Sequence, residues 1–164
     1  YPLVTGVQTC ALPILMVSHY TPATDTDDSG FKADQMFAEA KGFDIAPDAT
    51  FWVGKERGRR GDVHIVDTFF VEMAGVGAGF KGQPAGPGKL GVAFYKTDKD
   101  ATKPGNRLNV EYVGVPLGAD GALNVFATAT QGDFDGGKSG YGLTVRHDQK
   151  KLFGTGLENT LWLQ

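Results

Sequence analysis

A two-residue alternation of side chains runs through four successive segments, at residues 90–95, 107–115, 123–130 and 141–147. The second segment shows the pattern most plainly, because its two faces carry Leu108, Val110 and Tyr112 on one side and Arg107, Asn109 and Glu111 on the other. Successive side chains of a β-strand point to opposite faces of the sheet. The four segments therefore predict antiparallel strands with one apolar face and one wet face.

Further strands are predicted at residues 36–43, 50–55 and 157–163, so that the chain is all-β with about eight strands. The connections TDKDATKPG, PLGADG and QGDFDGGKSG consist largely of Gly, Asp and Pro, which are turn residues. A water-soluble β-sandwich and a membrane β-barrel both produce this alternation. No apolar run approaches the ~20 residues of a membrane helix, but a membrane β-barrel has no such run, because its outward apolar residues alternate with inward polar ones.

The composition limits the class of protein and its partners. A chain of 164 residues is one domain by the usual relation of length to domain number. Its 21% charged residues and net charge of −3 fit neither a disordered chain nor a polybasic nucleic-acid-binding protein. The single cysteine, Cys10, can form neither an internal disulfide nor a Cys-based zinc site. We expect no metal and no cofactor.

The first residues differ in character from the rest. Residues 4–14 read VTGVQTCALPI, which looks like the translation of a common sequencing adapter joined to a gene. A fragment of a signal peptide is the alternative, but such a peptide has a basic region before its apolar region, and no Lys or Arg precedes Lys32. We therefore expect residues 1–14 to be non-native and residues 15–164 to form the domain.

A long linker separates the strand-like segments at residues 50–55 and 90–96. It is rich in Gly, Arg, Asp and Phe, which makes it too charged for a core and too aromatic for a solvent spacer. Long connections inside β proteins are usually functional. We therefore predict a functional loop at about residues 56–78.

Matches to one family extend along this linker. They are GK at 54–55, R-x-D-V-H at 60–64, an Asp at 67, an aromatic pair at 69–70, G-x-G-A-G at 75–79 and GKL at 88–90. In this run the chain resembles the inward-folded third loop of the maltoporin family, the sugar-specific porins of Gram-negative outer membranes. A second stretch, at residues 139–164, is similar to a maltoporin hairpin.

The resemblance implies a fold and a function. Maltoporins form eighteen-stranded antiparallel barrels, assemble as homotrimers and pass maltose and maltodextrins by diffusion, with no cofactor and no bond broken. We therefore predict a partial antiparallel transmembrane β-barrel, which would be an open curved sheet, located in the outer membrane of a Gram-negative bacterium. Its expected partners are carbohydrate permeants, outer-membrane lipid and two further copies of the full-length protein. No nucleic-acid partner and no enzymatic activity are expected.

The same resemblance assigns residues to the pore constriction. It places Arg60 and Asp62 on a track of charged residues, Asp67 on the same track, and Phe69 where the family has a constriction tyrosine. His64 matches a histidine of that loop, and Glu72 takes the place of an aspartate. An aromatic ring can cover the apolar face of a pyranose, while carboxylates and a guanidinium engage pairs of hydroxyls. Such contacts are weak, since a permeant must leave as readily as it enters.

The chain departs from the family pattern at three places. Ala38 stands where the family has an arginine of the charged track, and Phe69 lacks the hydroxyl of the tyrosine that it replaces. An aromatic residue of the family's final matched strand falls on Leu161. Trp162 is one position away, and a shift of one residue would turn its side chain to the lipid face.

Other interpretations of the linker remain open. Arg57, Arg59 and Arg60 form either a solvated basic turn or a set that holds the loop to wall carboxylates such as Glu111. We expect wall pairing for Arg57 and Arg59 and pore exposure for Arg60.

The same arginines suggest a general or anion-preferring porin as an alternative function. The carboxylates Asp62, Asp67 and Glu72 suggest a soluble glycan-binding or glycosidase β-sandwich, although a glycosidase needs two carboxylates fixed on rigid strands. His64 and Asp67 are too few ligands for a zinc site.

Overall fold

The alternating segments form one antiparallel sheet. The computed structural model describes residues 10–20, 30–63, 68–96, 105–132 and 139–164. Each strand pairs with the next along the chain, in the order β1 (Cys10–Tyr20), β2 (Gly30–Lys41), β3 (Thr50–Val63), β4 (Thr68–Ala85), β5 (Gly88–Lys96), β6 (Asn106–Leu117), β7 (Gly121–Gln131), β8 (Gly140–Gln149) and β9 (Asn159–Leu163). A short 3-10 helix, η1 (Leu152–Gly154), lies between β8 and β9.

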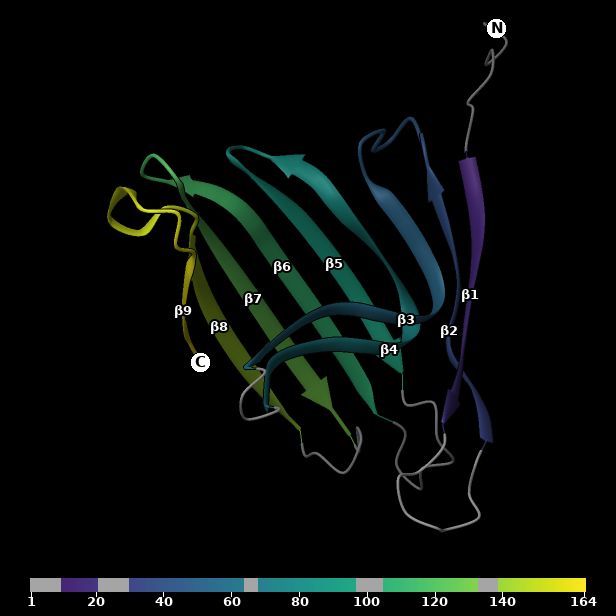
Figure 1. Cartoon of the computed structure of the whole chain (residues 1–164). Coiled ribbons are helices and arrows are strands. Elements are labelled where there is room, and N and C mark those ends of the chain that lie inside the picture. Colours follow the sequence, from purple (N-terminus) through teal and green to yellow (C-terminus); the bar gives the residue numbers. More distant parts are fainter. Residues whose placement is uncertain (1–9, 21–29, 64–67, 97–104, 133–138) are drawn as a thin grey trace, which may run out of the picture.

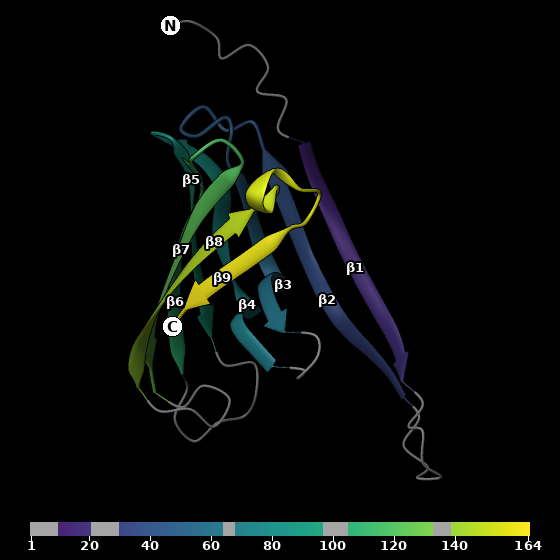
Figure 2. The ribbon, with the colours of Figure 1, turned by 60° about the vertical axis from the view of Figure 1, so that its left-hand side comes forward.

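The sheet is open and strongly curved (Figure 1). In the described part of the chain, β1 and β9 are its two edges, and the view in Figure 2 shows the two sides of the resulting trough facing each other. The predicted fold class, an all-β partial porin barrel in the form of an open curved sheet, is confirmed. None of the helices among the described residues has the length and apolar character needed to cross a membrane.

The two faces of the sheet have opposite chemistry. Directly opposed residues share a face, so the register joins Phe94, Leu108, Ala129 and Tyr141 in one row and Val92, Val110, Ala127 and Leu143 in the next. On this face Leu108 is 43% and Leu143 58% exposed. The other face carries Asn109 and Thr144, which are only 2% and 5% exposed. The sheet therefore presents apolar side chains outward and encloses polar ones.

The strands of the wall have the length of membrane-crossing strands. The strands β5 to β8 have 9, 12, 11 and 10 residues. A tilted strand of about 9–11 residues crosses the hydrocarbon core of a bilayer. A sheet with polar residues on its enclosed face and an apolar outer band is typical of a membrane β-barrel wall.

The predicted long loop at 56–78 is instead a β-hairpin, which corrects the sequence-based expectation. The strand β3 continues to Val63 and β4 begins at Thr68, and the two strands stay paired into the tip. Figure 1 shows this hairpin bending away from the wall and crossing the concave side of the sheet. The alternation that identifies strands requires one apolar face. A hairpin inside a wet trough has no such face, so its sequence reads as a loop.

The strand β1 begins at Cys10 and pairs with β2 from Cys10 opposite Lys41 to Tyr20 opposite Gly30. It therefore includes residues 10–14, which belong to the segment predicted as non-native. That assignment of residues 1–14 stays a prediction, since pairing in the sheet does not reveal the origin of a sequence.

The opposite polarity of neighbouring residues gives a first prediction. The side chain of Leu143 lies on the outer face, whereas a Cβ added to Gly142 would point to the concave face, with no atom of the described residues within 4 Å of it. In the full-length protein folded into phospholipid vesicles, Leu143→Arg should lower the free energy of unfolding by about 2–4 kcal/mol, the cost of an arginine facing the bilayer midplane. Urea titration measures this change. The neighbouring substitution Gly142→Arg is the control and should cost much less; an equal cost for both would contradict the assignment of faces.

Candidate functional site

The hairpin leaves the wall at a bulge that contains a glycine. The register passes from Arg57 opposite Ala74 to Arg60 opposite Glu72, so that Gly58 and Arg59 stand against Met73 alone. Such a bulge bends the strand that carries the extra residue. A Cβ on Gly58 would lie 2.2 Å from the carbonyl oxygen of Met73. The close approach of the two hairpin strands at the bend therefore depends on glycine.

Two wall residues bind backbone carbonyls of the hairpin at this bend. The hydroxyl of Tyr95 on β5 donates a buried hydrogen bond of 2.8 Å to the carbonyl oxygen of Met73. The guanidinium of Arg107 on β6 donates a partly buried hydrogen bond of 2.5 Å to the carbonyl oxygen of Ala74. A Cβ on Gly75 would lie 2.9 Å from the ring of Tyr95. The missing side chain thus lets the hairpin lie directly on the Tyr95 ring.

Arg59 joins the hairpin to a more distant part of the wall. Its Nε donates to Oε2 of Glu111 on β6 at 2.6 Å, and its Nη2 donates to Oε1 at 3.4 Å. The guanidinium carbon also lies 5.6 Å from the centroid of the Phe126 ring on β7. The predicted pairing of Arg59 with a wall carboxylate, and with Glu111 in particular, is confirmed.

Arg57 pairs with the wall as well, but on the other side. Its Nη2 lies 3.2 Å from Oδ2 of Asp34 on β2, and its backbone N–H donates to the side-chain oxygen of Gln35 at 3.0 Å. The predicted wall pairing of Arg57 is therefore confirmed, with a carboxylate from the preceding strand as its partner.

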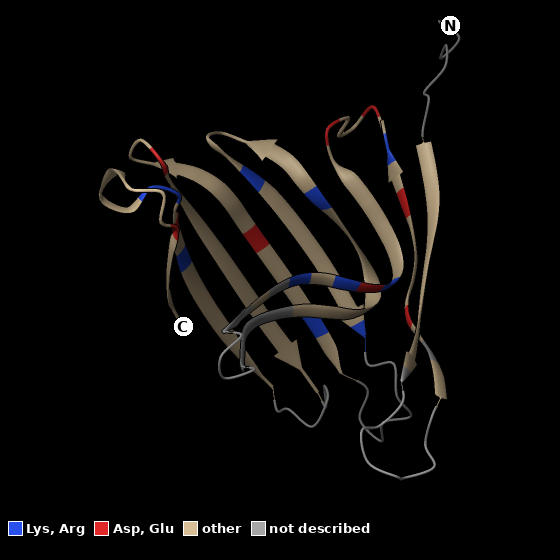
Figure 3. Cartoon of the chain, viewed as in Figure 1, with Lys and Arg blue, Asp and Glu red and all other residues tan. Residues whose placement is uncertain are grey.

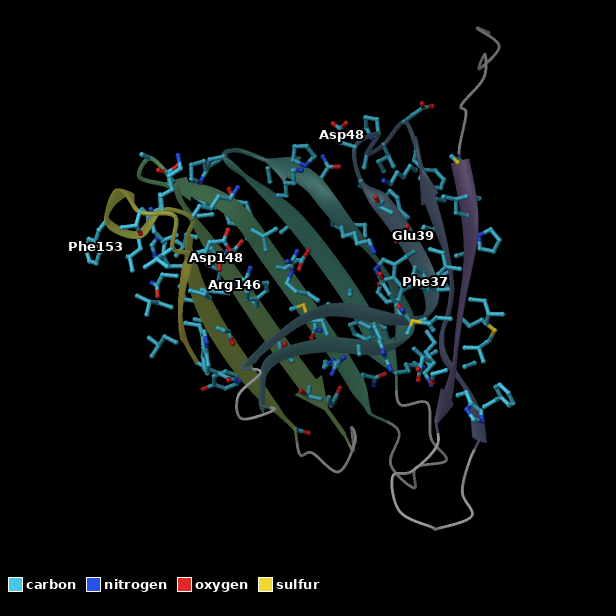
Figure 4. The ribbon with its side chains drawn as sticks, viewed as in Figure 1. Phe37, Glu39, Asp48, Arg146, Asp148 and Phe153 are labelled. Carbon is cyan, nitrogen blue, oxygen red and sulfur yellow. The ribbon has the colours of Figure 1, made fainter. Side chains whose placement is uncertain are left out.

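A third charged cluster lies on the wall part of the hairpin strands, ahead of the bend, where β2, β3 and β4 run side by side. Nζ of Lys81 lies 2.7 Å from Oε1 of Glu39 and 2.5 Å from Oε1 of Glu56. It also lies 5.9 Å from the centroid of the Phe37 ring. Figure 4 labels Phe37 and Glu39, close together on β2. Sequence reasoning missed this cluster because its three charges are widely spaced along the chain and only the register brings them together.

A cavity of about 310 Å³ lies between the bend and the wall. Its lining includes aromatic and charged side chains, among them Trp52, Glu56, Arg59, Tyr95, Asn109 and Glu111. The rings of Trp52 and Tyr95 are 5.5 Å apart and both are buried. Trp52 belongs to β3 and Tyr95 to the wall strand β5, so the two rings meet where the hairpin leaves the wall.

Four of the six residues predicted at the constriction lie on the paired strands of the hairpin. Arg60 stands opposite Glu72, and Asp62 opposite Phe69. The side chains of these four lie outside the described part of the structure, as do His64 and Asp67 entirely. The register thus brings two oppositely charged residues together, while the roles of all six stay predictions.

A further polar cluster lies on the concave side of β8, where Figure 4 labels Arg146 and Asp148. Oδ2 of Asp148 accepts hydrogen bonds from Nε of Arg146 at 3.0 Å and from Nδ2 of Asn124 at 2.8 Å. Its Oδ1 accepts one from the hydroxyl of Thr160 on β9 at 3.0 Å. The cluster fixes a carboxylate and a guanidinium on the enclosed face.

Trp162 lies on this same concave face, which corrects the expectation that it turns toward lipid. It pairs directly opposite Arg146, and Leu161 pairs opposite His147. Arg146 belongs to the enclosed face, because its guanidinium reaches within 5.9 Å of the buried Phe126 ring. The sequence-based assignment counted positions along the chain, whereas the face of a residue is set by its register with β8. Trp162 is 39% exposed and thus accessible from the concave side.

Figure 3 shows charged residues on β3 of the hairpin, on several wall strands and at turns along the upper edge of the sheet. The described ion pairs include Arg57–Asp34, Arg59–Glu111 and Arg146–Asp148, and Lys81 pairs with both Glu39 and Glu56. The residues with described side chains include no group of three His, Cys, Asp or Glu placed to hold a metal ion. The site consists of fixed hydrogen-bonding groups beside an accessible aromatic ring.

An open antiparallel sheet with an apolar outer face, a charged inner face and an inward hairpin defines a section of a porin wall. The LamB porin family model matches residues 12–164. The chain therefore belongs to the LamB porin family, which confirms the resemblance found in the linker.

Curated relatives agree with this membership. The maltoporin of Hahella chejuensis is 36% identical over 98 residues, which are 59% of this chain and 24% of the relative. Maltoporin 1 of Aeromonas salmonicida is 37% identical over 92 residues, or 54% of this chain and 22% of the relative. The maltoporin of Vibrio cholerae is 28% identical over 125 residues, or 75% of this chain and 30% of the relative. The chain thus spans about a quarter of the length of these relatives.

The crowded bend gives a second prediction. Gly58→Ala should lower the free energy of unfolding of the full-length protein in vesicles by about 1–3 kcal/mol, the usual cost of an extra methyl group in a closely packed site. The clash is with a backbone carbonyl, which cannot rotate away. Gly140→Ala, at a position where no atom of the described residues lies within 4 Å of the new Cβ, is the matched control. Equal urea midpoints for the two variants would show that the bend is less crowded than described.

Proposed function

We propose that the protein is a passive diffusion channel for carbohydrates of the maltose and maltodextrin type in the outer membrane of a Gram-negative bacterium. The observation that carries this proposal is the charged hairpin that crosses the concave face of a porin sheet. The curated relatives named maltoporin support the sugar specificity. A porin conducts without chemical conversion, so at the level of the family no enzymatic activity is expected.

The geometry of the concave face suits a polyhydroxylated permeant. Carboxylates accept hydrogen bonds from sugar hydroxyls, and guanidinium groups donate to them. Arg146 and Asp148 are held by neighbouring side chains, so they offer these bonds without large rearrangement. The ring of Trp162 on the next strand can cover the apolar C–H face of a pyranose. The proposed constriction residues Arg60, Asp62, His64, Asp67, Phe69 and Glu72 would provide the corresponding contacts on the hairpin.

The partners follow from the two faces of the sheet. The outer face, with Leu108 and Leu143 exposed, would contact outer-membrane lipid. The full-length protein would assemble as a homotrimer, as the resemblance to maltoporins implies. The net charge of −3 does not favour a nucleic-acid partner, and the proposed transport needs no cofactor.

The alternatives are less well supported. The arginine cluster suggested an anion-preferring porin, but Arg57 and Arg59 each pair with a wall carboxylate, which offsets their charge. A soluble β-sandwich would cover its apolar face with a second sheet, whereas the described strands form one sheet whose apolar face is exposed. Asp62 and Glu72 do lie on paired strands rather than on a loop. Membership of the porin family, and not flexibility of these carboxylates, therefore disfavours a glycosidase.

The proposed charged track gives a third prediction. The full-length protein in a planar bilayer should conduct ions, and maltotriose should block that current. The double variant Arg60→Ala with Asp62→Ala should weaken the block roughly tenfold or more, since a hydrogen bond to a charged group contributes about 1.5–3 kcal/mol. Titration of the current with sugar measures the change. A wild-type current that no oligosaccharide alters would rule out the sugar-specific channel.

The position of Trp162 gives a fourth prediction. Trp162→Ala should weaken the maltotriose block, because it removes the accessible ring from the concave face. Leu161→Ala is the matched control: it truncates the neighbouring side chain, which points to the opposite face, and should leave the block unchanged. If Leu161→Ala weakened the block as much as Trp162→Ala, the assignment of faces in β9 would be wrong.

A further inference from the structure

We propose that four side chains hold the hairpin in one fixed position, so that the aperture of the channel is set by its attachment to the wall. These residues are Arg59, Tyr95, Arg107 and Glu111, called here the hairpin anchor. They are positioning residues, since they act on the hairpin and not on the permeant. The inference rests on the proposed function, because it concerns the constriction of that same channel.

The anchor is needed because the bend disturbs the β-ladder. Gly58 and Arg59 stand opposite Met73 alone, and a bulge leaves its extra residue out of the regular pairing. A backbone carbonyl at such a place needs another donor when it is buried. The hydroxyl of Tyr95 provides this donor for Met73, and Arg107 provides it for Ala74. The wall thus satisfies the groups that bending would leave without partners.

The ion pair fixes the direction in which the hairpin leaves the wall. Arg59 belongs to the hairpin, whereas Glu111 belongs to β6, three strands away in the sheet. The side chain of Glu111 is 13% exposed, so water screens the pair only in part. A Cβ on Gly91 would lie 2.8 Å from Cγ of Glu111. Gly91 therefore leaves the space in which the carboxylate lies flat on the wall and reaches Arg59.

Apolar packing adds to the polar contacts. Met73 of the hairpin and Phe126 of β7 form a buried cluster, with Val113 packed against it. The guanidinium of Arg59 covers the same Phe126 ring. At its bend the hairpin therefore contacts side chains of β5, β6 and β7, in addition to the covalent continuation of its own strands.

Because the hairpin contacts several wall strands, it should act as a fixed constriction and not as a movable gate. A hairpin joined to the barrel only by the ends of β3 and β4 would swing about its bend. Contacts with three further strands restrain that rotation, so the open channel should show one steady current in the absence of sugar. Removing an anchor contact should produce a second conductance level that the wild-type protein rarely visits.

The test uses single-channel recordings of the full-length protein without sugar. Arg59→Gln and Glu111→Gln should each raise the occupancy of a second conductance level roughly tenfold, as expected for the loss of one charge-assisted hydrogen bond. The double variant should resemble either single variant, because both singles remove the same interaction. Tyr95→Phe, which deletes one hydroxyl and little volume, should act in the same direction.

Arg57→Gln is the matched control. It also removes a hairpin-strand arginine from an ion pair, but that pair joins β3 to its neighbour β2 and not to β5, β6 or β7. Its recordings should match those of the wild type. The proposal is overturned if folded Arg59→Gln and Glu111→Gln channels are as steady as the wild type, or if their effects add in the double variant. These recordings contain no sugar, so a failure of sugar block would reject the proposed function and leave this test intact.

Discussion

The structure depends on the requirement that a sheet facing lipid must satisfy its backbone polar groups within itself. Strand-to-strand pairing meets this requirement, and alternation then fixes the chemistry of the two faces. Rows such as Phe94, Leu108 and Tyr141 face outward, while Asn109, Glu111 and Thr144 face the enclosed side. Polar residues such as Asn109 and Thr144 are consequently buried, while large apolar residues such as Leu143 and Tyr141 are exposed. This order is the reverse of that in a water-soluble sandwich.

The hairpin of β3 and β4 is the part of the chain that does not follow this rule. It crosses the enclosed side (Figure 1), and its sequence mixes charges and glycines with its apolar residues. Its stability comes from the wall: Tyr95, Arg107 and Glu111 bind it at the bend. The same groups that satisfy the bent backbone therefore determine where the proposed constriction lies.

Sequence reasoning predicted the wall strands well because each has an apolar face, and it predicted the pairing of Arg59 with Glu111 because a charged linker beside a polar wall needs counter-charges. It missed the strands of the hairpin, whose two wet faces give no periodic signal. It also misplaced Trp162, because register with β8 determines its face. The cluster of Glu39, Glu56 and Lys81 could not be predicted either, since bulges and strand register bring these residues together.

In the full-length protein the outer face should contact lipid and the concave face should contact water. The most direct test is a nitroxide attached to a single cysteine, in a Cys10→Ser background, at Leu108 on the outer face or at Gly142 on the concave face of the full-length protein in vesicles. Relaxation of the label at residue 108 should respond to oxygen dissolved in the bilayer, and that at residue 142 to a water-soluble nickel chelate. Labels that both respond to the chelate, or that respond in the reverse order, would contradict the claim.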